Sequence, residues 1–286
     1  MNEAVSTHGE IPCARGVSTD SLGTDAVGKT TRKRLKTGPL AVIITMNAWV
    51  YTVFLPINLL LPWLLPALKE HGVFGIVWPS RDIPAEQLVR IMTEYRTEYQ
   101  LIGMIWMAAG IQFLIAACGF AAQVRKMESG VRIYSNIILA TAALGCFVMM
   151  LSSALWTGMS YSPSLESPHT LKMFYEVFWI FFWISWPPYA VQAIAISIPI
   201  LSVPKGSETL PRWVAYVSLS SAGLWALFGL AGIINVGNFA YDGWGQFVML
   251  LSFFIESTVV VPLGAGIWIY RKEILPKKRA AKLAQA

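Results

Sequence analysis

Six long runs of apolar residues, separated by polar segments, dominate the chain. They extend from Leu40 to Leu65, Tyr99 to Ala122, Ile133 to Trp156, Met173 to Leu201, Trp213 to Val236 and Trp244 to Tyr270. About 20 helical residues cross a hydrocarbon core of about 30 Å, so each run is long enough. A β-barrel would instead show short alternating strands. The pattern therefore predicts an all-α polytopic membrane bundle with six transmembrane helices.

The Lys and Arg residues are distributed unequally between the two sides of these six spans. The N-terminal segment, the loops after the second and fourth spans and the C-terminal segment carry 17 of them, whereas the other three loops carry 5. Because positive side chains stay preferentially in the cytoplasm, both termini are expected there, in a bacterial inner membrane. The predicted organisation is a disordered basic tail over 1–38, a transmembrane domain over 39–271 and a basic tail over 272–286.

The first loop on the outer side contains the pattern of an amphipathic helix. Asp82 followed by Pro84 is typical of a helix start. An apolar face and a charged face then run side by side along the segment. The apolar face comprises Leu88, Ile91, Met92 and Tyr95, and the charged face comprises Glu86, Arg90 and Glu94. We expect this helix to seal the outer end of the bundle or, alternatively, to cover a ligand.

Composition agrees with a membrane location and excludes some other classes. Hydrophobic residues make up 55% of the chain and charged residues only 13%, against about 25% charged in soluble domains. The net charge of +6 lies beside apolar runs, which is typical of topology signals and contact with membrane lipids rather than nucleic acid. The N-terminal segment lacks the apolar core of a signal peptide. Three cysteines offer no disulfide framework.

Glu256 is the strongest candidate for a functional side chain. It lies near the middle of the sixth predicted span, where a charge costs about 2.5 to 3.5 kcal/mol. It must therefore be protonated, face a polar cavity or pair with a group on another helix. The polar residues that could meet it are Gln192, Asn47, Gln112, Asn136 and Asn235. Glu176, about one turn inside the outer end of the fourth span, is expected to be an interfacial carboxylate reached by water.

Two prolines interrupt the fourth predicted span. Pro187 and Pro188 have no backbone N–H, so two carbonyls in the preceding turn lose their helical partners. A kink, and with it a pocket facing Glu256, is expected there, although such kinks also serve packing alone. The candidate ligand-binding or proton-linked residues are Glu256, Gln192, Trp183, Trp186, Asn47, Gln112 and Glu176.

Catalytic and metal-binding patterns are missing from the sequence. The three histidines, His8, His71 and His169, lie outside the predicted spans. The spans therefore provide no bis-histidine haem ligands or HExxH zinc site, and the chain has no Walker A or GxSxG motif. We assign no catalytic residue and no metal ligand. Cofactors remain unknown, because an apolar cofactor can be held by surfaces that leave no motif.

The last hundred residues carry a family resemblance. The segments FWISWPPYAVQAIAI and LPRWVAYVSLSSAGLWALFGLAGIINVGNFAYDGWGQF resemble a group of six-span integral membrane proteins of actinobacteria and proteobacteria. The shared features are the Pro-Pro before a Val-Gln, the PRW that opens the fifth span and the Gly-x-Phe-Ala-x-x-Gly before the sixth. The resemblance implies the six-span layout and no particular activity.

Three functions are compatible with this pattern. The first is binding or transport of a hydrophobic small molecule or lipid, which predicts a pocket lined by Trp183, Trp186, Gln192 and Glu256. The second is an accessory or structural subunit of a larger membrane complex, whose partners would be other membrane-protein subunits. The third is a membrane enzyme that uses Glu256 or Glu176 as a general acid or base.

Overall fold

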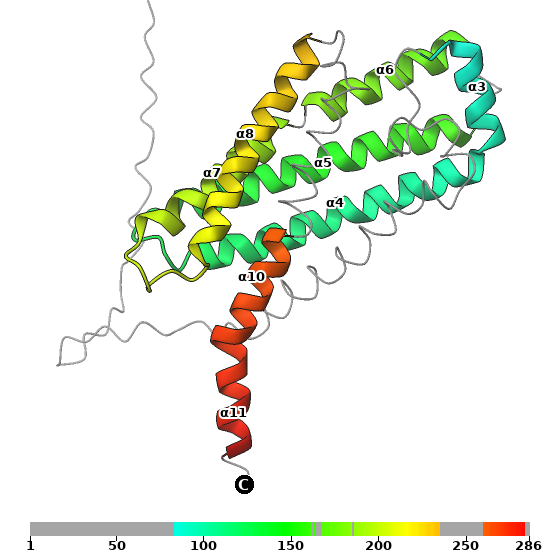
Figure 1. Ribbon diagram of the computed structural model, residues 1–286. Coiled ribbons are helices and arrows are strands. Elements are labelled where there is room, and N and C mark those ends of the chain that lie inside the picture. Colours follow the sequence, from blue (N-terminus) through cyan, green and yellow to red (C-terminus); the bar gives the residue numbers. More distant parts are fainter. Residues whose placement is uncertain (1–82, 162, 164–166, 185, 235–259, 284–286) are drawn as a thin grey trace, which may run out of the picture. The chain divides into compact units, whose positions relative to one another are not determined.

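The computed structural model describes residues 83–161, 163, 167–184, 186–234 and 260–283, and every regular element in these ranges is helical. They all belong to one compact unit, Thr37–Ala286. The predicted first span, Asn47 and Glu256 lie outside the described residues, as does the 1–38 tail. The described elements are α3 (Ala85–Glu94), α4 (Arg96–Val124), α5 (Ile133–Tyr161), α6 (Pro168–Ile184), α7 (Trp186–Ser202), α8 (Arg212–Ile234), α10 (Val261–Ile269), the π-helical turn η4 (Tyr270–Ile274) and α11 (Leu275–Leu283) (Figure 1).

Three stretches of the described chain are long and apolar enough to cross a membrane. They are Arg96–Val124, Ile133–Tyr161 and Pro168–Ser202, and they contain the predicted spans 99–122, 133–156 and 173–201. The chain is therefore all-helical in its described part, with three candidate membrane-spanning helices. α8 covers most of the predicted fifth span, 213–236, and the count of six spans stays a prediction.

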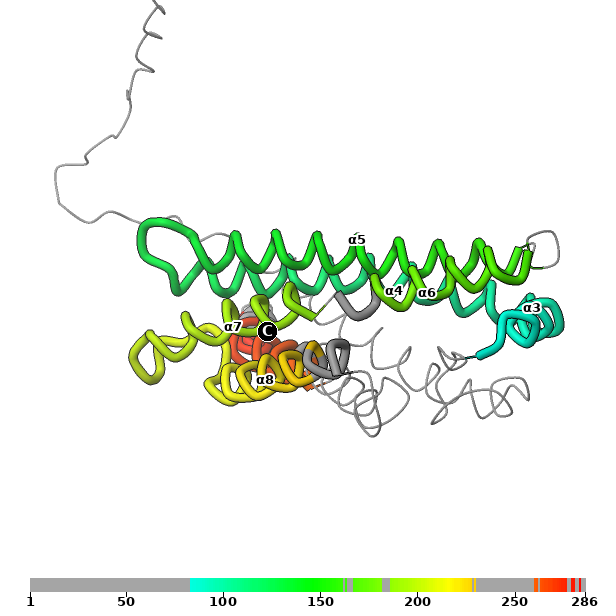
Figure 2. Tube along the Cα trace, turned by 90° about the horizontal axis from the view of Figure 1, so that it is seen from above, coloured from blue at the N-terminus to red at the C-terminus, as the bar shows by residue number. Residues whose placement is uncertain are grey.

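The helices α4 and α5 run side by side along most of their length in both views (Figures 1 and 2). A glycine on α4 permits this close approach, because a Cβ at Gly103 would collide with Thr157 Oγ1 and would lie 3.3 Å from the Ser153 carbonyl oxygen. Two turns further along α4, a Cβ at Gly110 would lie 3.2 Å from Met149 Cβ. Small residues at such contacts are how helices pack closely in lipid.

The helix α3 covers one end of α4, α5 and α6. Its Leu88, Ile91 and Met92 are fully buried, while Glu86 and Glu94 are exposed. Beneath α3 lies an aromatic cluster in which the Trp156 ring centroid is 5.0 Å from that of Tyr99. The buried members of this cluster on the other helices are Tyr99, Ile102, Trp156, Met159, Leu171, Tyr175, Phe178 and Trp179. Its position at a membrane interface stays a prediction.

The two prolines of the fourth predicted span lie close to the boundary between α6 and α7. Pro187 and Pro188 directly follow Trp186, the first described residue of α7, and residue 185 before it lies outside the described residues. The kink expected at these two prolines therefore stays a prediction. A third proline, Pro199, lies inside the same helix near its C-terminal end.

Candidate functional site

A cavity of about 40 Å³ lies between four helices, α4, α7, α8 and α10. It is lined by Phe113, Ala116, Ala117, Phe120, Tyr189, Gln192, Ala193, Ile196, Ser218, Trp225 and Val261. The lining therefore joins parts of the chain that are far apart in sequence. A water needs roughly 10–15 Å³ of cavity, so a cavity of about 40 Å³ has room for about two or three water-sized groups.

Helical spacing explains how the lining residues share one wall. Tyr189, Gln192, Ala193 and Ile196 occupy positions i, i+3, i+4 and i+7 of α7, which project from one face of a helix. The four lining residues of α4, Phe113, Ala116, Ala117 and Phe120, have the same spacing. Two short stripes on neighbouring helices thus face each other, and alanines in each stripe leave the space between them.

Two polar atoms in this cavity have no hydrogen-bond partner within the described part of the chain. They are Gln192 Oε1 and Ser218 Oγ. The Gln192 residue is only 6% exposed and Ser218 is fully buried. A buried polar atom without a partner costs about 1–3 kcal/mol, and such atoms in native proteins are usually satisfied by water or a ligand. The cavity therefore offers an acceptor and a hydroxyl in an otherwise apolar lining.

Aromatic rings hold the wall around Gln192 in place. The Tyr189 ring stacks on Trp225, with centroids 4.8 Å apart and planes inclined by 19°. It also meets Phe113 edge to face at 5.2 Å. The Tyr189 hydroxyl donates a hydrogen bond to the Gly145 carbonyl oxygen at 3.5 Å. These contacts tie α7 to α4, α5 and α8, so the cavity lies in a packed rather than an adaptable region.

The candidate site residues predicted from the sequence lie in different surroundings. Gln192 lines the cavity. Gln112 is half-buried on α4 with its Oε1 unpartnered in the described chain, and it is outside the lining. The Trp186 indole packs against Gly229, where a Cβ would lie 2.6 Å from its Nε1. The Glu176 carboxylate is 46% exposed and 3.9 Å from Lys172 Nζ. Asn47, Glu256 and the side chain of Trp183 lie outside the part of the chain that the structure describes.

Sequence reasoning missed most of the lining. Ser218 and the aromatic residues Phe113, Tyr189 and Trp225 are not among the candidates that the sequence predicts. One usable signal is the helical spacing of alanines with aromatics in α4. It is weak, because that helix is apolar on all sides.

A second set of polar contacts lies where the α4–α5 loop, the α7–α8 loop and η4 meet. Lys126 Nζ donates to Glu273 Oε1 at 3.1 Å, and Thr209 Oγ1 donates to the Gln123 carbonyl at 3.0 Å. Lys272 Nζ donates to the Glu208 carbonyl at 3.0 Å. Three segments predicted to share one side of the membrane therefore contact one another.

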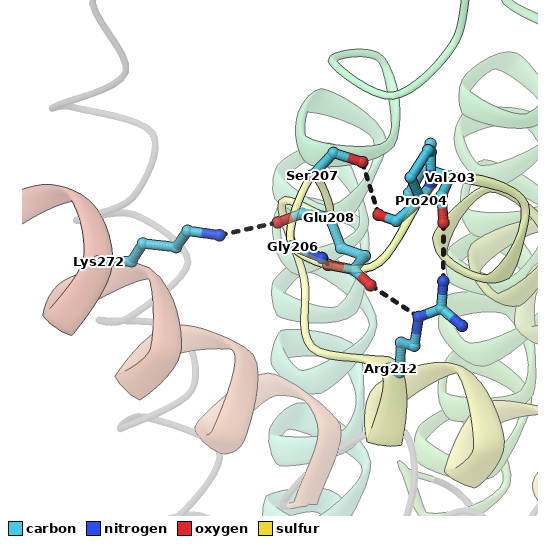
Figure 3. Close-up of polar contacts among 7 residues, drawn as sticks. All are labelled: Val203, Pro204, Gly206, Ser207, Glu208, Arg212 and Lys272. Carbon is cyan, nitrogen blue, oxygen red and sulfur yellow. Dashed lines mark hydrogen bonds and ion pairs between the residues drawn. The ribbon is translucent and has the colours of Figure 1, made fainter.

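Within the α7–α8 loop, Glu208 is held by two donors (Figure 3). Arg212 Nε donates to its Oε1 at 2.7 Å and the Gly206 amide donates to its Oε2 at 2.6 Å. Gly206 has a φ of +91°, a conformation that favours glycine. The Arg212 hydrogen bond, aided by the amides, lowers the pKa of the Glu208 carboxyl below its ordinary value of 4.5. These contacts stabilise the conformation of the loop.

Among the described residues, no three His, Cys, Asp or Glu side chains lie close enough together to hold a metal ion. Comparisons with protein-family models, with curated proteins and with solved structures found no match for the chain. The resemblance suggested by the last hundred residues stays an expectation, and a functional conclusion must rest on the geometry of the site.

Proposed function

We propose that this chain is a multi-pass protein of the bacterial inner membrane that binds a hydrophobic small molecule or lipid. The observation that carries the proposal is a pair of buried polar atoms, Gln192 Oε1 and Ser218 Oγ, in the cavity between α4, α7, α8 and α10. Neither atom has a hydrogen-bond partner among the described residues. A ligand with one hydrogen-bonding group and an apolar body matches that lining. Ser218 can donate or accept, whereas Gln192 offers an acceptor.

The volume limits how much of the ligand the cavity takes. Room for two or three water-sized groups admits a hydroxyl, an amine or a short end of a chain, and it excludes a fused ring system. The polar end group therefore lies in the cavity, and the apolar remainder lies outside it along the helices. This arrangement suits an elongated lipid or a chain-bearing small molecule better than a compact one.

The proposed orientation has both termini in the cytoplasm. The contacts of Lys126 with Glu273 and of Lys272 with Glu208 support it, because they join segments that the distribution of Lys and Arg assigns to the same side. Single cysteines at Lys205 and at Glu94 test it in intact cells. A membrane-impermeant thiol reagent is expected to label the Glu94→Cys variant from outside and to leave Lys205→Cys unlabelled, and the reverse pattern would contradict the orientation.

The binding proposal is tested by purifying the full chain in mild detergent and identifying bound small molecules by native mass spectrometry. The wild type is expected to retain a stoichiometric apolar ligand. Gln192→Leu removes the acceptor, and Ala117→Leu fills the cavity from α4, so both variants should lose most of the ligand. Ser218→Ala should weaken retention by about tenfold, the size of one lost neutral hydrogen bond.

A matched control lies one turn further along α8. Ser221 is also buried, with its Oγ unpartnered in the described chain, and it is not in the cavity lining. Ser221→Ala should retain the ligand as the wild type does. The proposal would be contradicted if Ser218→Ala and Gln192→Leu both retained as much ligand as the wild type. It would also be contradicted if no preparation contained a bound molecule.

A further inference from the structure

Positive charge is concentrated at the end of the molecule where the two loops and the C-terminal segment meet. Residues 123–132, 203–212 and 271–283 contain eleven Lys and Arg but only three Glu, a formal charge of +8. The basic residues are Arg125, Lys126, Arg132, Lys205, Arg212, Arg271, Lys272, Lys277, Lys278, Arg279 and Lys282. At the α3 end, residues 83–98 and 167–176 contain three Lys and Arg and four Glu. We call the first of these regions the basic end.

The carboxylates of the basic end are already engaged. Glu128 Oε1 accepts from the amide of Tyr134 at 2.6 Å, Glu208 pairs with Arg212, and Glu273 pairs with Lys126. Intramolecular pairing therefore neutralises only part of the positive charge. In contrast, the exposed side chains of Arg132, Lys205 and Arg271 have no ion-pair or hydrogen-bond partner within the described residues. These side chains remain available to an external anion.

The C-terminal elements α10, η4 and α11 form one continuous helical rod, which belongs in part to the basic end. Residues 261–283 are helical throughout, with the π-helical turn η4 in the middle, and η4 is fixed to both loops by Glu273 and Lys272. In Figure 1 this rod crosses the direction of α4 and α5, and in Figure 2 it is seen nearly end-on while α4 and α5 run across the view. α11 therefore extends from the segment that Glu273 and Lys272 hold at the basic end.

We infer that the basic end binds the anionic headgroups of phospholipids in the adjoining membrane leaflet. The charge is complementary, the three carboxylates are engaged within the chain, and α11 adds four Lys and Arg to the segment that is held at the basic end. Basic clusters next to a membrane helix gain binding from each Lys or Arg near an anionic surface. This site is separate from the cavity at Gln192 and does not depend on the ligand proposed there.

The test uses the full chain in mild detergent with equal amounts of phosphatidylglycerol and phosphatidylcholine. Bound lipids are counted by native mass spectrometry. The wild type should carry phosphatidylglycerol in preference, and 0.5 M salt should reduce that preference through screening. Lys277→Gln, Lys278→Gln, Arg279→Gln and Lys282→Gln combined should lower the preference by at least about tenfold. These positions leave the Lys272 and Glu273 contacts intact.

The matched control neutralises the other end of the molecule. Arg90→Gln, Arg96→Gln and Lys172→Gln combined should leave the lipid preference as in the wild type. No preference in the wild type, or an equal fall in both combined variants, would overturn the inference. Gln192→Leu, which tests the cavity, should not change the preference, so failure of one proposal is distinguishable from failure of the other.

Discussion

Lys126 Nζ lies 3.1 Å from Glu273 Oε1, an ion pair between residues 147 positions apart in the chain. It fastens η4 to the α4–α5 loop. Both side chains are roughly a quarter exposed, so water and salt screen the attraction, and pairs of this kind contribute about 0–1 kcal/mol. The contact nevertheless fixes where the basic C-terminal helix leaves the bundle.

A double-mutant cycle with Lys126→Gln and Glu273→Gln measures that contribution. Each single variant is expected to lower the free energy of unfolding by about 0.5–1 kcal/mol. The double variant should lose less than the sum of the two, because the second substitution removes a partner that is already gone. Unfolding in detergent, followed by circular dichroism, gives the three differences. Strict additivity would show that the pair does not form in solution.

The Glu208 carboxylate predicts a pH dependence of stability. Its pKa is lowered, so the ionised form favours the folded state, and this contribution is fully present above the unfolded value of 4.5. It is lost as pH falls through the folded pKa. The melting temperature of the wild type should therefore exceed that of Glu208→Gln at pH 7, and the difference should shrink below about pH 4.5. A difference that grows with acidity would contradict the Arg212 contact.

Glu128 acts as a cap for α5. Its Oε1 accepts from the amides of Tyr134 at 2.6 Å and Ser135 at 3.2 Å, in the first turn of that helix. A carboxylate there satisfies amides without helical acceptors and interacts favourably with the helix dipole. Glu128→Ala should lower the free energy of unfolding by about 1 kcal/mol. Glu94→Ala, at an exposed position on α3, is the control and should change it by less than about 0.5 kcal/mol.

The close approach of α4 and α5 predicts that two glycines respond oppositely to alanine. At Gly103 the new Cβ would press on Thr157 Oγ1 and Cβ, so Gly103→Ala should destabilise by about 1–3 kcal/mol. At Gly158, on α5, a Cβ would meet no atom of the described residues within 4 Å. Gly158→Ala should be neutral or stabilising by up to about 1 kcal/mol, because alanine is the better helix former.

A second substitution makes the clash explicit. Thr157→Ala removes the hydroxyl that the Gly103 methyl would meet, and it should recover part of the stability lost in Gly103→Ala. Thermal unfolding in one detergent compares the wild type, Gly103→Ala, Gly158→Ala and the double variant Gly103→Ala with Thr157→Ala. Equal melting temperatures for Gly103→Ala and Gly158→Ala would mean that the helices are further apart than the structure shows.

The apolar runs predict the positions of α4 and α5 well, because length and hydropathy are local properties. The start at Ile133 coincides with α5, whereas its end is five residues later than predicted, at Tyr161. The small and polar residues Thr157, Gly158 and Ser160 lower the hydropathy there, yet all three are helical, and Thr157 and Ser160 are buried. Hydropathy therefore defines the most apolar part of a helix and not its full length.

The site could be predicted only in part. Gln192 stands out because an amide in an apolar run needs a partner. Ser218 does not, since serines in apolar helices usually bond their own backbone or pack closely. The residues that complete the cavity come from α4, α7, α8 and α10, and their meeting depends on long-range packing that no local pattern encodes. The expected pocket at Glu256 stays a prediction outside the described residues.

The most direct test of ligand binding is an experimental density map of the full chain, extracted gently from its native membrane, at a resolution that shows side-chain hydrogen bonding around Gln192. We expect elongated non-protein density with one end in the cavity, within hydrogen-bonding distance of Gln192 and Ser218. A cavity filled only by water, or closed by a direct contact between those two side chains, would contradict ligand binding.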